Sequence, residues 1–198
     1  MHFSILSVSM MFLAYLFGSL CSAIIICKAF GLTDPRSQGS NNPGATNVLR
    51  LHGKKFAGMV LIGDMLKGTI PVMIGRFLHL ETFDLGCMAL FCVLGHMYPV
   101  FFHFKGGKGV ATALGTYFGL NIFLGLLCLG LWIFAAWMKK YSSLASLITA
   151  FFAPLYAVMI MKTGAIFYPL FIMSFIIIAK HHENIQRLWR GEESQIQK

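Results

Sequence analysis

Six apolar stretches, most of them about twenty residues long, dominate the sequence and constrain its fold. They cover residues 3–27, 56–78, 85–104, 110–138, 143–161 and 164–179. An α-helix rises about 1.5 Å per residue, so about twenty apolar residues cross the hydrocarbon core of a bilayer. Hydrophobic residues make up 57% of the 198 residues and charged residues 12%, about half the share found in soluble domains. The sequence therefore predicts an all-α polytopic membrane protein that forms a single domain over residues 1–198.

The basic residues predict how this membrane domain is oriented. The net charge is +9, and thirteen of the sixteen Lys and Arg residues lie in four polar segments: 28–55, 105–109, 139–143 and the tail from residue 180. Because Lys and Arg are enriched in cytoplasmic loops, we expect all four segments on the cytoplasmic side. That arrangement requires residues 110–138 to cross twice, as two short helices broken near Gly119-Leu120-Asn121. The prediction is seven transmembrane helices, some short, with the N-terminus outside and the C-terminus cytoplasmic; hydropathy alone gives five or six.

Composition and spacing exclude several other classes of protein. Residues 3–30 are too long for a signal-peptide core and follow no basic segment, so we expect them to remain as a membrane helix. The five cysteines all lie in apolar stretches without metal-ligand spacing, which predicts neither a disulfide nor a metal. The positive charge is not gathered in a separate soluble domain, which argues against nucleic-acid binding and leaves contact with anionic lipids or the excess of Lys and Arg in cytoplasmic loops.

The segment from Gly39 to Arg50 is the first candidate binding site. It combines small residues with polar side chains, namely Ser40, Asn42, Thr46, Asn47 and Arg50. Small residues let backbone N–H groups approach a ligand closely, and arginine offers a planar fork of donors that matches phosphate. A polar turn that only caps the following helix explains the same composition equally well.

Glycine and lysine define the second candidate, in the run Gly106-Gly107-Lys108-Gly109. A glycine turn that opens a helix can surround a phosphate with backbone amides and add one point charge. The run is not a nucleotide-binding P-loop, because Phe102 and Gly109 stand where that motif needs Gly and Ser or Thr. The alternative is a plain turn whose lysines only mark the cytoplasmic side.

Two further polar groups lie at the ends of apolar stretches. His181 and Asn184 are three residues apart and can share a helix face, where a histidine is available for proton transfer or phosphate binding. Ser143 follows Lys139 and Lys140 and adds a hydroxyl to the same predicted side. The alternative for the histidine segment is a polar helix end at the membrane interface.

Asp64 and Lys67 are charged residues within the second apolar stretch. They lie three residues apart, on one helix face, and a lone charge near the bilayer centre costs roughly 2.5–3.5 kcal/mol. We therefore predict that they pair. The pair serves either the stability of the helix bundle or direct contact with a substrate, and the sequence leaves both open.

Taken together, these segments resemble one enzyme family along nearly the whole chain. The resemblance rests on Gly39 to Arg50, Asp64 to Pro71, Gly95 to Thr112, and His181 to Asn184. The sequence is similar to the bacterial acyl-phosphate:glycerol-3-phosphate acyltransferases, which are integral membrane proteins. This resemblance implies seven helices in the inner membrane, an active site at the cytoplasmic face and no cofactor. It implies transfer of a fatty acyl group from acyl phosphate to the 1-hydroxyl of glycerol 3-phosphate, with lysophosphatidate and phosphate as products.

The resemblance also implies roles for single residues. Ser40 and Arg50 match essential residues of the family, and Gly106, Gly107 and Gly109 match its phosphate loop, with Lys108 beside them. Further matches to phosphate-site residues are Ser143, His181 and Asn184, and Glu183 matches a structural glutamate. For the proton of the attacking hydroxyl, His181 and a phosphate of the bound substrates are the two candidate acceptors, and we favour the phosphate.

Two other functions fit part of the pattern. An organophosphate transporter also needs arginine, lysine and helix ends around a phosphate, but it binds substrate near the bilayer midplane, whereas these clusters gather at one face. A structural membrane subunit leaves the polar glycine-rich segments unexplained. Formation of a new covalent product distinguishes the enzyme from both.

Overall fold

The computed structural model describes residues 4–196 and contains ten α-helices and two short 3-10 helices over that range, without a β-strand. Residues 1–3 and 197–198, among them Lys198 of the predicted basic tail, lie outside the described residues. The α-helices are α1 (Ile5–Gly18), α2 (Ser22–Ala29), α3 (Ala45–His52), α4 (Lys54–Phe77), α5 (Thr82–Met97), α6 (Val110–Leu120), α7 (Ile122–Lys139), α8 (Ser142–Met161), α9 (Phe167–Lys180) and α10 (His182–Arg190). The 3-10 helices are η1 (Val100–Phe102) and η2 (Gly164–Ile166).

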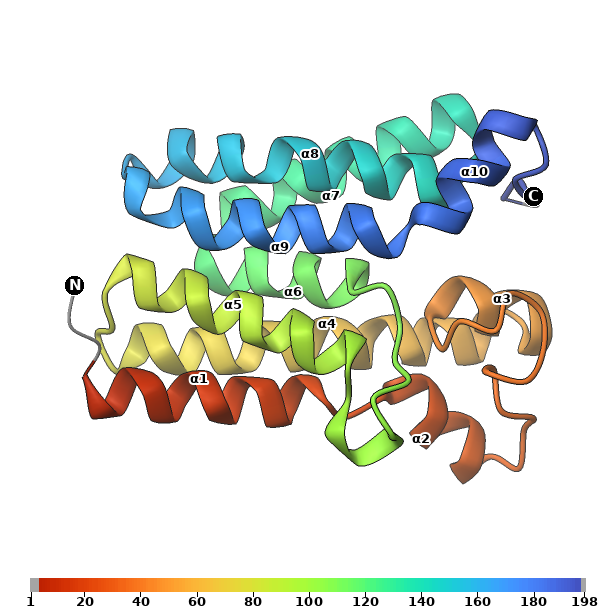
Figure 1. Cartoon of the computed structure of the whole chain (residues 1–198), viewed down its shortest axis with the longest axis horizontal. Coiled ribbons are helices and arrows are strands. Elements are labelled where there is room, and N and C mark those ends of the chain that lie inside the picture. The colour runs from red at the N-terminus through yellow and green to blue at the C-terminus, as the bar shows by residue number, and fades with distance from the viewer. Residues whose placement is uncertain (1–3, 197–198) are drawn as a thin grey trace.

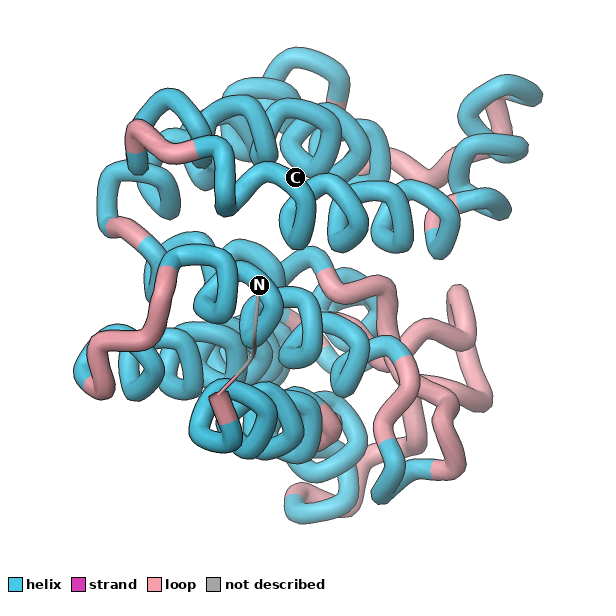
Figure 2. Tube along the Cα trace, turned by 60° about the vertical axis from the view of Figure 1, so that its left-hand side comes forward, coloured by secondary structure: helices cyan, strands magenta, loops and turns pink. Residues whose placement is uncertain are grey.

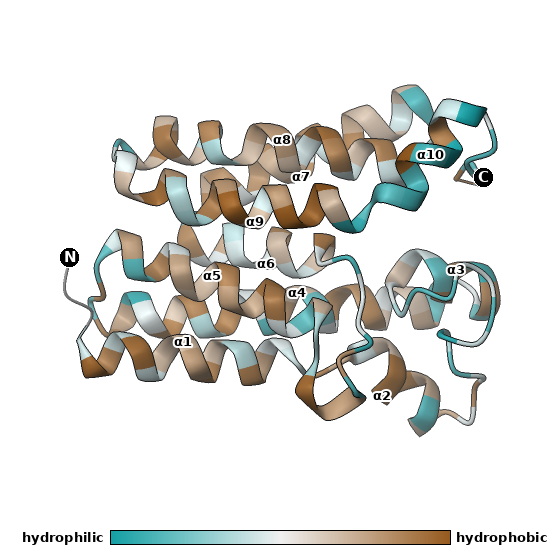
Figure 3. Cartoon of the chain, viewed as in Figure 1, coloured by the Kyte–Doolittle hydropathy of each residue, from teal (hydrophilic) through white to brown (hydrophobic). Residues whose placement is uncertain are grey.

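The long helices lie side by side along one common axis, and Figure 1 and Figure 2 show this bundle from two directions. Helix α1 begins at one end of the bundle, whereas α3 and α10 lie at the other end (Figure 1). Polar residues gather at the end that holds α3 and α10, while the long helices are mostly apolar (Figure 3). Large apolar side chains such as Phe77, Phe123 and Phe151 remain exposed, as expected where lipid covers the surface.

Length and hydropathy identify the helices that can cross a bilayer. Four are long and apolar enough: α4, α5 together with η1, α7 and α8. The number rises to six if the bent pairs α1 with α2 and α9 with α10 each form one span. Helix α6 has 11 residues and a length of about 16 Å, so it cannot cross the core of about 30 Å alone. The all-helical membrane fold is confirmed, and the prediction of seven crossings depends on α6.

Helix α6 is held inside the protein by close contact with α4. Added Cβ atoms would meet the opposing backbone at both Gly68 and Gly115, at 2.3 Å from the Thr112 carbonyl oxygen and 2.0 Å from that of Met65. Glycines at these positions therefore let the two backbones approach closely, as small residues do in membrane helix pairs. The Thr69 hydroxyl also donates to the carbonyl of Gly115 (2.8 Å). A short helix can thus lie at membrane depth because protein, and not lipid, covers it.

The predicted break in residues 110–138 is confirmed. Helix α6 ends at Leu120, and Asn121 caps the start of α7 by accepting a hydrogen bond from the amide of Phe123 (2.8 Å). Asparagine is one of the preferred residues at helix N-termini, which explains why this polar residue marks the break.

The membrane helix expected over residues 3–30 is broken into two helices, which together are long and apolar enough for one bent span. Helix α1 ends at Gly18 and α2 begins at Ser22, with a bend of 40° between them. The Leu20 carbonyl in this break accepts a hydrogen bond from the Lys67 amine (2.8 Å), which satisfies a backbone group that the break exposes. Lys67 also pairs with Asp64 at 2.9 Å, so the predicted ion pair is confirmed.

Candidate active site

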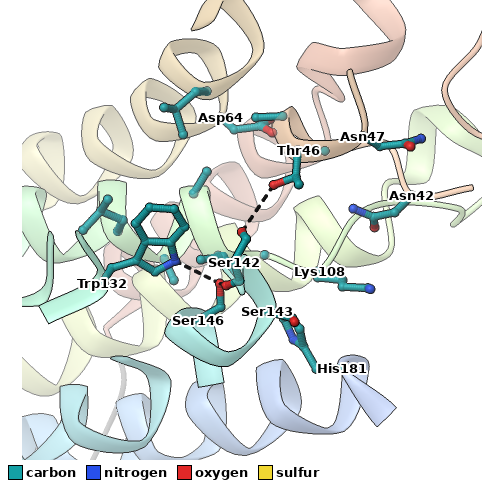
Figure 4. Close-up of a pocket in the computed structure, with 18 of the residues that line it drawn as sticks. Asn42, Thr46, Asn47, Asp64, Lys108, Trp132, Ser142, Ser143, Ser146 and His181 are labelled. Carbon is teal, nitrogen blue, oxygen red and sulfur yellow. Dashed lines mark hydrogen bonds between the residues drawn. The ribbon is translucent and has the colours of Figure 1, made fainter. Parts of the chain in front are cut away.

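A cavity of about 870 Å³ lies where the polar loops meet the helix bundle. Its lining comes from α3, α4, α6, α7, α8, from the ends of α5 and α9, and from α10 and the tail after it. Most predicted site residues line it: Ser40, Asn42, Thr46, Asn47, Arg50, Lys108, Gly109, Ser143, His181 and Asn184. Segments between residues 39 and 194 therefore contribute to one site, and Figure 4 shows part of this arrangement.

Asn47 holds the first loop in shape. Its side-chain amide donates to the carbonyls of Pro35 (2.8 Å) and Gln38 (3.0 Å), and its oxygen accepts from the backbone amide of Ser40 (3.0 Å). The side chain is 1% exposed. Both of its N–H groups are donated to backbone carbonyls and are not free for a ligand, and its oxygen holds the Ser40 amide, so Asn47 positions Ser40.

Ser40 and Arg50 present free polar groups to the same cavity. Across residues 4–196, no hydrogen bond or ion pair engages the Ser40 hydroxyl or the Arg50 guanidinium. Thr46 lies between them in sequence, and its hydroxyl is 3.5 Å from that of Ser142, which connects α3 to α8 (Figure 4). The loop therefore brings two unengaged donors to a cavity, as an anion site requires.

Lys108 enters a polar cluster on the other side of the cavity. Its amine donates a hydrogen bond to the side-chain oxygen of Asn184. Burial lowers the pKa of the Lys108 amine, and the charge of Arg187 lowers it further. Burial has already removed much of the water around this lysine. An anion that binds the amine therefore displaces little further water.

Glu193 is the buried partner that the sequence analysis missed. Its carboxylate accepts hydrogen bonds of 2.7 Å from the Ser143 hydroxyl, the Asn184 amide and the Arg187 guanidinium. Burial raises the pKa of Glu193, but these hydrogen bonds outweigh it and leave the pKa below its ordinary value. The Glu183 side chain is 62% exposed and 3.9 Å from Arg187, so Glu193 is the glutamate that organises this cluster.

Gly191 is the one sequence signal that points toward Glu193. It ends α10 in the left-handed conformation (φ 71°), which turns the following residues back toward the bundle. The amide of Glu192 then donates to the carbonyl of Arg187 (2.8 Å). A glycine after a helical pattern predicts such an ending, but it does not reveal which side chain reaches the site.

His181 lies past the last residue of α9 and is 3% exposed. Its Nδ1 is 2.8 Å from the Ile177 carbonyl oxygen, which can only accept, so Nδ1 carries the proton and Nε2 has the free lone pair. Burial lowers the pKa of His181 to about 4, and the nearby Lys108 acts in the same direction. The imidazole is therefore neutral at pH 7 and can accept a hydrogen bond at Nε2.

Gly106 and Gly107 do not line the cavity, in contrast to the expectation for the phosphate loop. The amide of Gly107 donates to the carbonyl of His96 (3.1 Å) and is thus not free for phosphate. A Cβ at Gly106 would lie 2.0 Å from that same carbonyl oxygen. The two glycines allow the loop to pack against His96, and only Lys108 and Gly109 of the run reach the cavity.

Beyond its polar mouth the cavity wall is mostly apolar. Its walls include Leu61, Met65, Leu114, Leu129 and Trp132, and the Trp132 indole donates to the Ser146 hydroxyl (3.0 Å). Free donors at one end and apolar walls at the other suit a ligand with an anionic head and a hydrocarbon tail. Among the described residues, no group of three or more His, Cys, Asp or Glu side chains is placed to hold a metal ion.

The family model for glycerol-3-phosphate acyltransferase matches residues 8–191. The chain belongs to this family. Members include a glycerol-3-phosphate acyltransferase of Vibrio cholerae, 49% identical over 96% of this chain and 91% of its own. A member from Aliivibrio fischeri is also 49% identical, over 96% of each chain.

Two solved structures of a glycerol-3-phosphate acyltransferase share the fold. A crystal structure of PlsY (YgiH), an integral membrane glycerol 3-phosphate acyltransferase in its glycerol 3-phosphate form, superposes with a TM-score of 0.90. It is 39% identical, and the match covers 96% of this chain and 94% of that one. The lysophosphatidic acid form gives a TM-score of 0.88 at 38% identity over the same shares.

Proposed function

We propose that this protein transfers a fatty acyl group from acyl phosphate to the 1-hydroxyl of sn-glycerol 3-phosphate, the first step of bacterial phospholipid synthesis. The observation that carries the proposal is the cavity itself, where the unengaged donors of Ser40 and Arg50 and the amine of Lys108 surround the entrance to an apolar chamber. An acyl phosphate has one anionic end and one apolar end, which match the polar entrance and the apolar walls of the cavity. The glycerol 3-phosphate and lysophosphatidic acid forms of the related PlsY support the same acceptor and product.

The residues do not need to form a covalent intermediate in this reaction. The 1-hydroxyl oxygen attacks the acyl carbon, the bond between that carbon and the phosphate oxygen breaks, and phosphate leaves with its electron pair. Arg50 binds phosphate through two parallel hydrogen bonds, and Ser40 and Lys108 add a hydroxyl and a positive charge. Holding both substrates in line and stabilising the negative charge account for several kcal/mol of barrier lowering.

The proton of the hydroxyl passes to a substrate phosphate in this proposal. The second pKa of a phosphate ester is about 6, whereas the pKa of His181 is lowered to about 4. The phosphate dianion is thus the stronger base at pH 7. His181 accepts a hydrogen bond from the attacking hydroxyl at Nε2, which orients the hydroxyl without removing its proton.

Acyl phosphate, and not acyl-CoA, is the expected donor. The cavity of about 870 Å³ must hold an acyl chain and glycerol 3-phosphate, and residues 4–196 form no separate domain that could bind a nucleotide. Purified protein is mixed with glycerol 3-phosphate and either donor, and lysophosphatidate is measured by mass spectrometry. We expect product with acyl phosphate alone, and comparable turnover with acyl-CoA would contradict the proposal.

We further propose that the protein spans the inner membrane seven times, with the cavity at the cytoplasmic face. The cavity is lined by parts of all four basic segments, which the positive-inside rule places in the cytoplasm. Lys105 and Lys140 are each replaced by cysteine in a variant that lacks the five native cysteines, and each protein is probed in intact cells. Both should resist an impermeant thiol reagent, and labelling of only one would show that α6 and α7 do not cross as a pair.

A further inference from the structure

A buried group of three ionisable side chains lies beside the cavity and has no role in the reaction proposed above. Asp64 Oδ1 on α4 is 2.9 Å from the Lys67 amine and 3.6 Å from Nδ1 of His96 at the end of α5. The three side chains are between 2% and 4% exposed. Asp64 and His96 also line the cavity, which a pair that only stabilises packing between α4 and α5 would not need to do.

His96 connects this network to the loop that carries Lys108. Its carbonyl accepts the Gly107 amide, and its imidazole lies against the Gly107 backbone. A Cβ at Gly107 would be 2.2 Å from Nε2 of His96, and the other atoms near it also belong to that ring. The imidazole therefore packs between the Asp64 carboxylate, which it approaches to 3.6 Å without a hydrogen bond, and the backbone of Gly107.

We propose that His96, packed between Asp64 and Gly107, is a positioning residue that sets where Lys108 lies in the cavity. Gly107 directly precedes Lys108, so a shift of the loop on His96 moves the lysine amine away from Asn184 and from a bound phosphate. Misplacing a binding group by about 1 Å is enough to reduce activity strongly. This inference depends on the proposed role of Lys108 in phosphate binding.

The contact between His96 and Gly107 provides a suppressor test. Gly107→Ala should push the imidazole aside and lower kcat/KM by about tenfold or more, comparable to the loss of one charge-assisted hydrogen bond. His96→Asn keeps a nitrogen near Asp64 but lacks the ring atoms beside Gly107, and it should lose a similar amount. In the double variant the alanine methyl occupies the vacated space, so the loss should not exceed that of His96→Asn alone. Losses that multiply would overturn the proposal.

Lys108→Met separates this inference from the proposed function. If Lys108→Met lowers kcat/KM, and adding His96→Asn to that variant lowers kcat/KM no further, then His96 acts through Lys108. If Lys108→Met is impaired and the two effects multiply, the inference fails while the proposed function stands. A Lys108→Met enzyme with normal kcat/KM would instead contradict the proposed phosphate site.

Asp84→Asn is the matched control. Asp84 lies at the end of α5 opposite His96. It accepts a hydrogen bond from Ser7 of α1 (2.5 Å), so it likewise makes a polar contact between two helices. We expect wild-type kcat/KM from this variant. Yield, monodispersity and thermal midpoint in detergent are recorded for every variant, and a His96→Asn protein that loses activity only in proportion to folded protein would show a purely structural role.

Discussion

Arg50→Lys should fold normally and lose about ten- to hundredfold of kcat/KM with acyl phosphate and glycerol 3-phosphate. The substitution keeps the positive charge but replaces a planar fork of donors with a point charge. One charge-assisted hydrogen bond of about 1.5–3 kcal/mol is lost, which corresponds to that range of rates. Because no hydrogen bond or ion pair engages the Arg50 guanidinium among the described residues, the substitution breaks none in the folded protein.

Arg190→Lys is the matched control, since Arg190 is an exposed arginine at the end of α10. It should retain wild-type kinetics. Steady-state rates are compared with the thermal midpoint of each purified variant. A well-folded Arg50→Lys protein with normal kcat/KM would mean that Arg50 does not bind phosphate.

Glu193→Ala should have the second large effect, and it should act on stability as well as on rate. The substitution removes a 7% exposed carboxylate that accepts three hydrogen bonds and leaves the Arg187 charge without this partner. Losing a buried, charge-assisted cluster costs about 3 kcal/mol or more, or roughly 6–12 °C in thermal midpoint for a chain of this size. Activity should fall more than about tenfold, because Ser143 and Asn184 lose their fixed positions.

Glu183→Ala provides the comparison, because that side chain is 62% exposed and should change the midpoint little. The pH dependence gives a further check. The folded pKa of Glu193 is below its ordinary value, so its contribution is complete above about pH 4.5 and is lost as the pH falls through the folded pKa. The difference between wild type and Glu193→Ala should therefore shrink below pH 4.5, and an unchanged difference there would contradict this account.

The helices were predictable wherever a local signal accompanied the apolar stretch. Asn121 marks the break between α6 and α7 because asparagine caps helices, and the basic residues of the flanking segments required that break. The break after Gly18 carries no such signal. Its backbone is satisfied by Lys67, forty-seven residues further along the chain, and no local pattern reports a contact of that range.

The candidate site was predictable as a set of residues but not as a set of roles. Asn47 and Arg50 belong to one polar segment, yet the first is fully engaged with the loop backbone and the second is free. Gly107 fits the pattern of a phosphate loop, but its amide is bound to His96. Which polar groups are already satisfied depends on partners from distant segments, and only the folded structure shows this.

The most direct test of the proposed reaction follows one oxygen atom. Glycerol 3-phosphate carrying ¹⁸O in its 1-hydroxyl is incubated with acyl phosphate and the purified protein, and both products are analysed by mass spectrometry. If the hydroxyl attacks the acyl carbon, the label appears in the ester oxygen of lysophosphatidate and the released phosphate carries none. Labelled glycerol 3-phosphate recovered without any lysophosphatidate, or a label transferred to a phosphate group, would contradict acyl transfer by this protein.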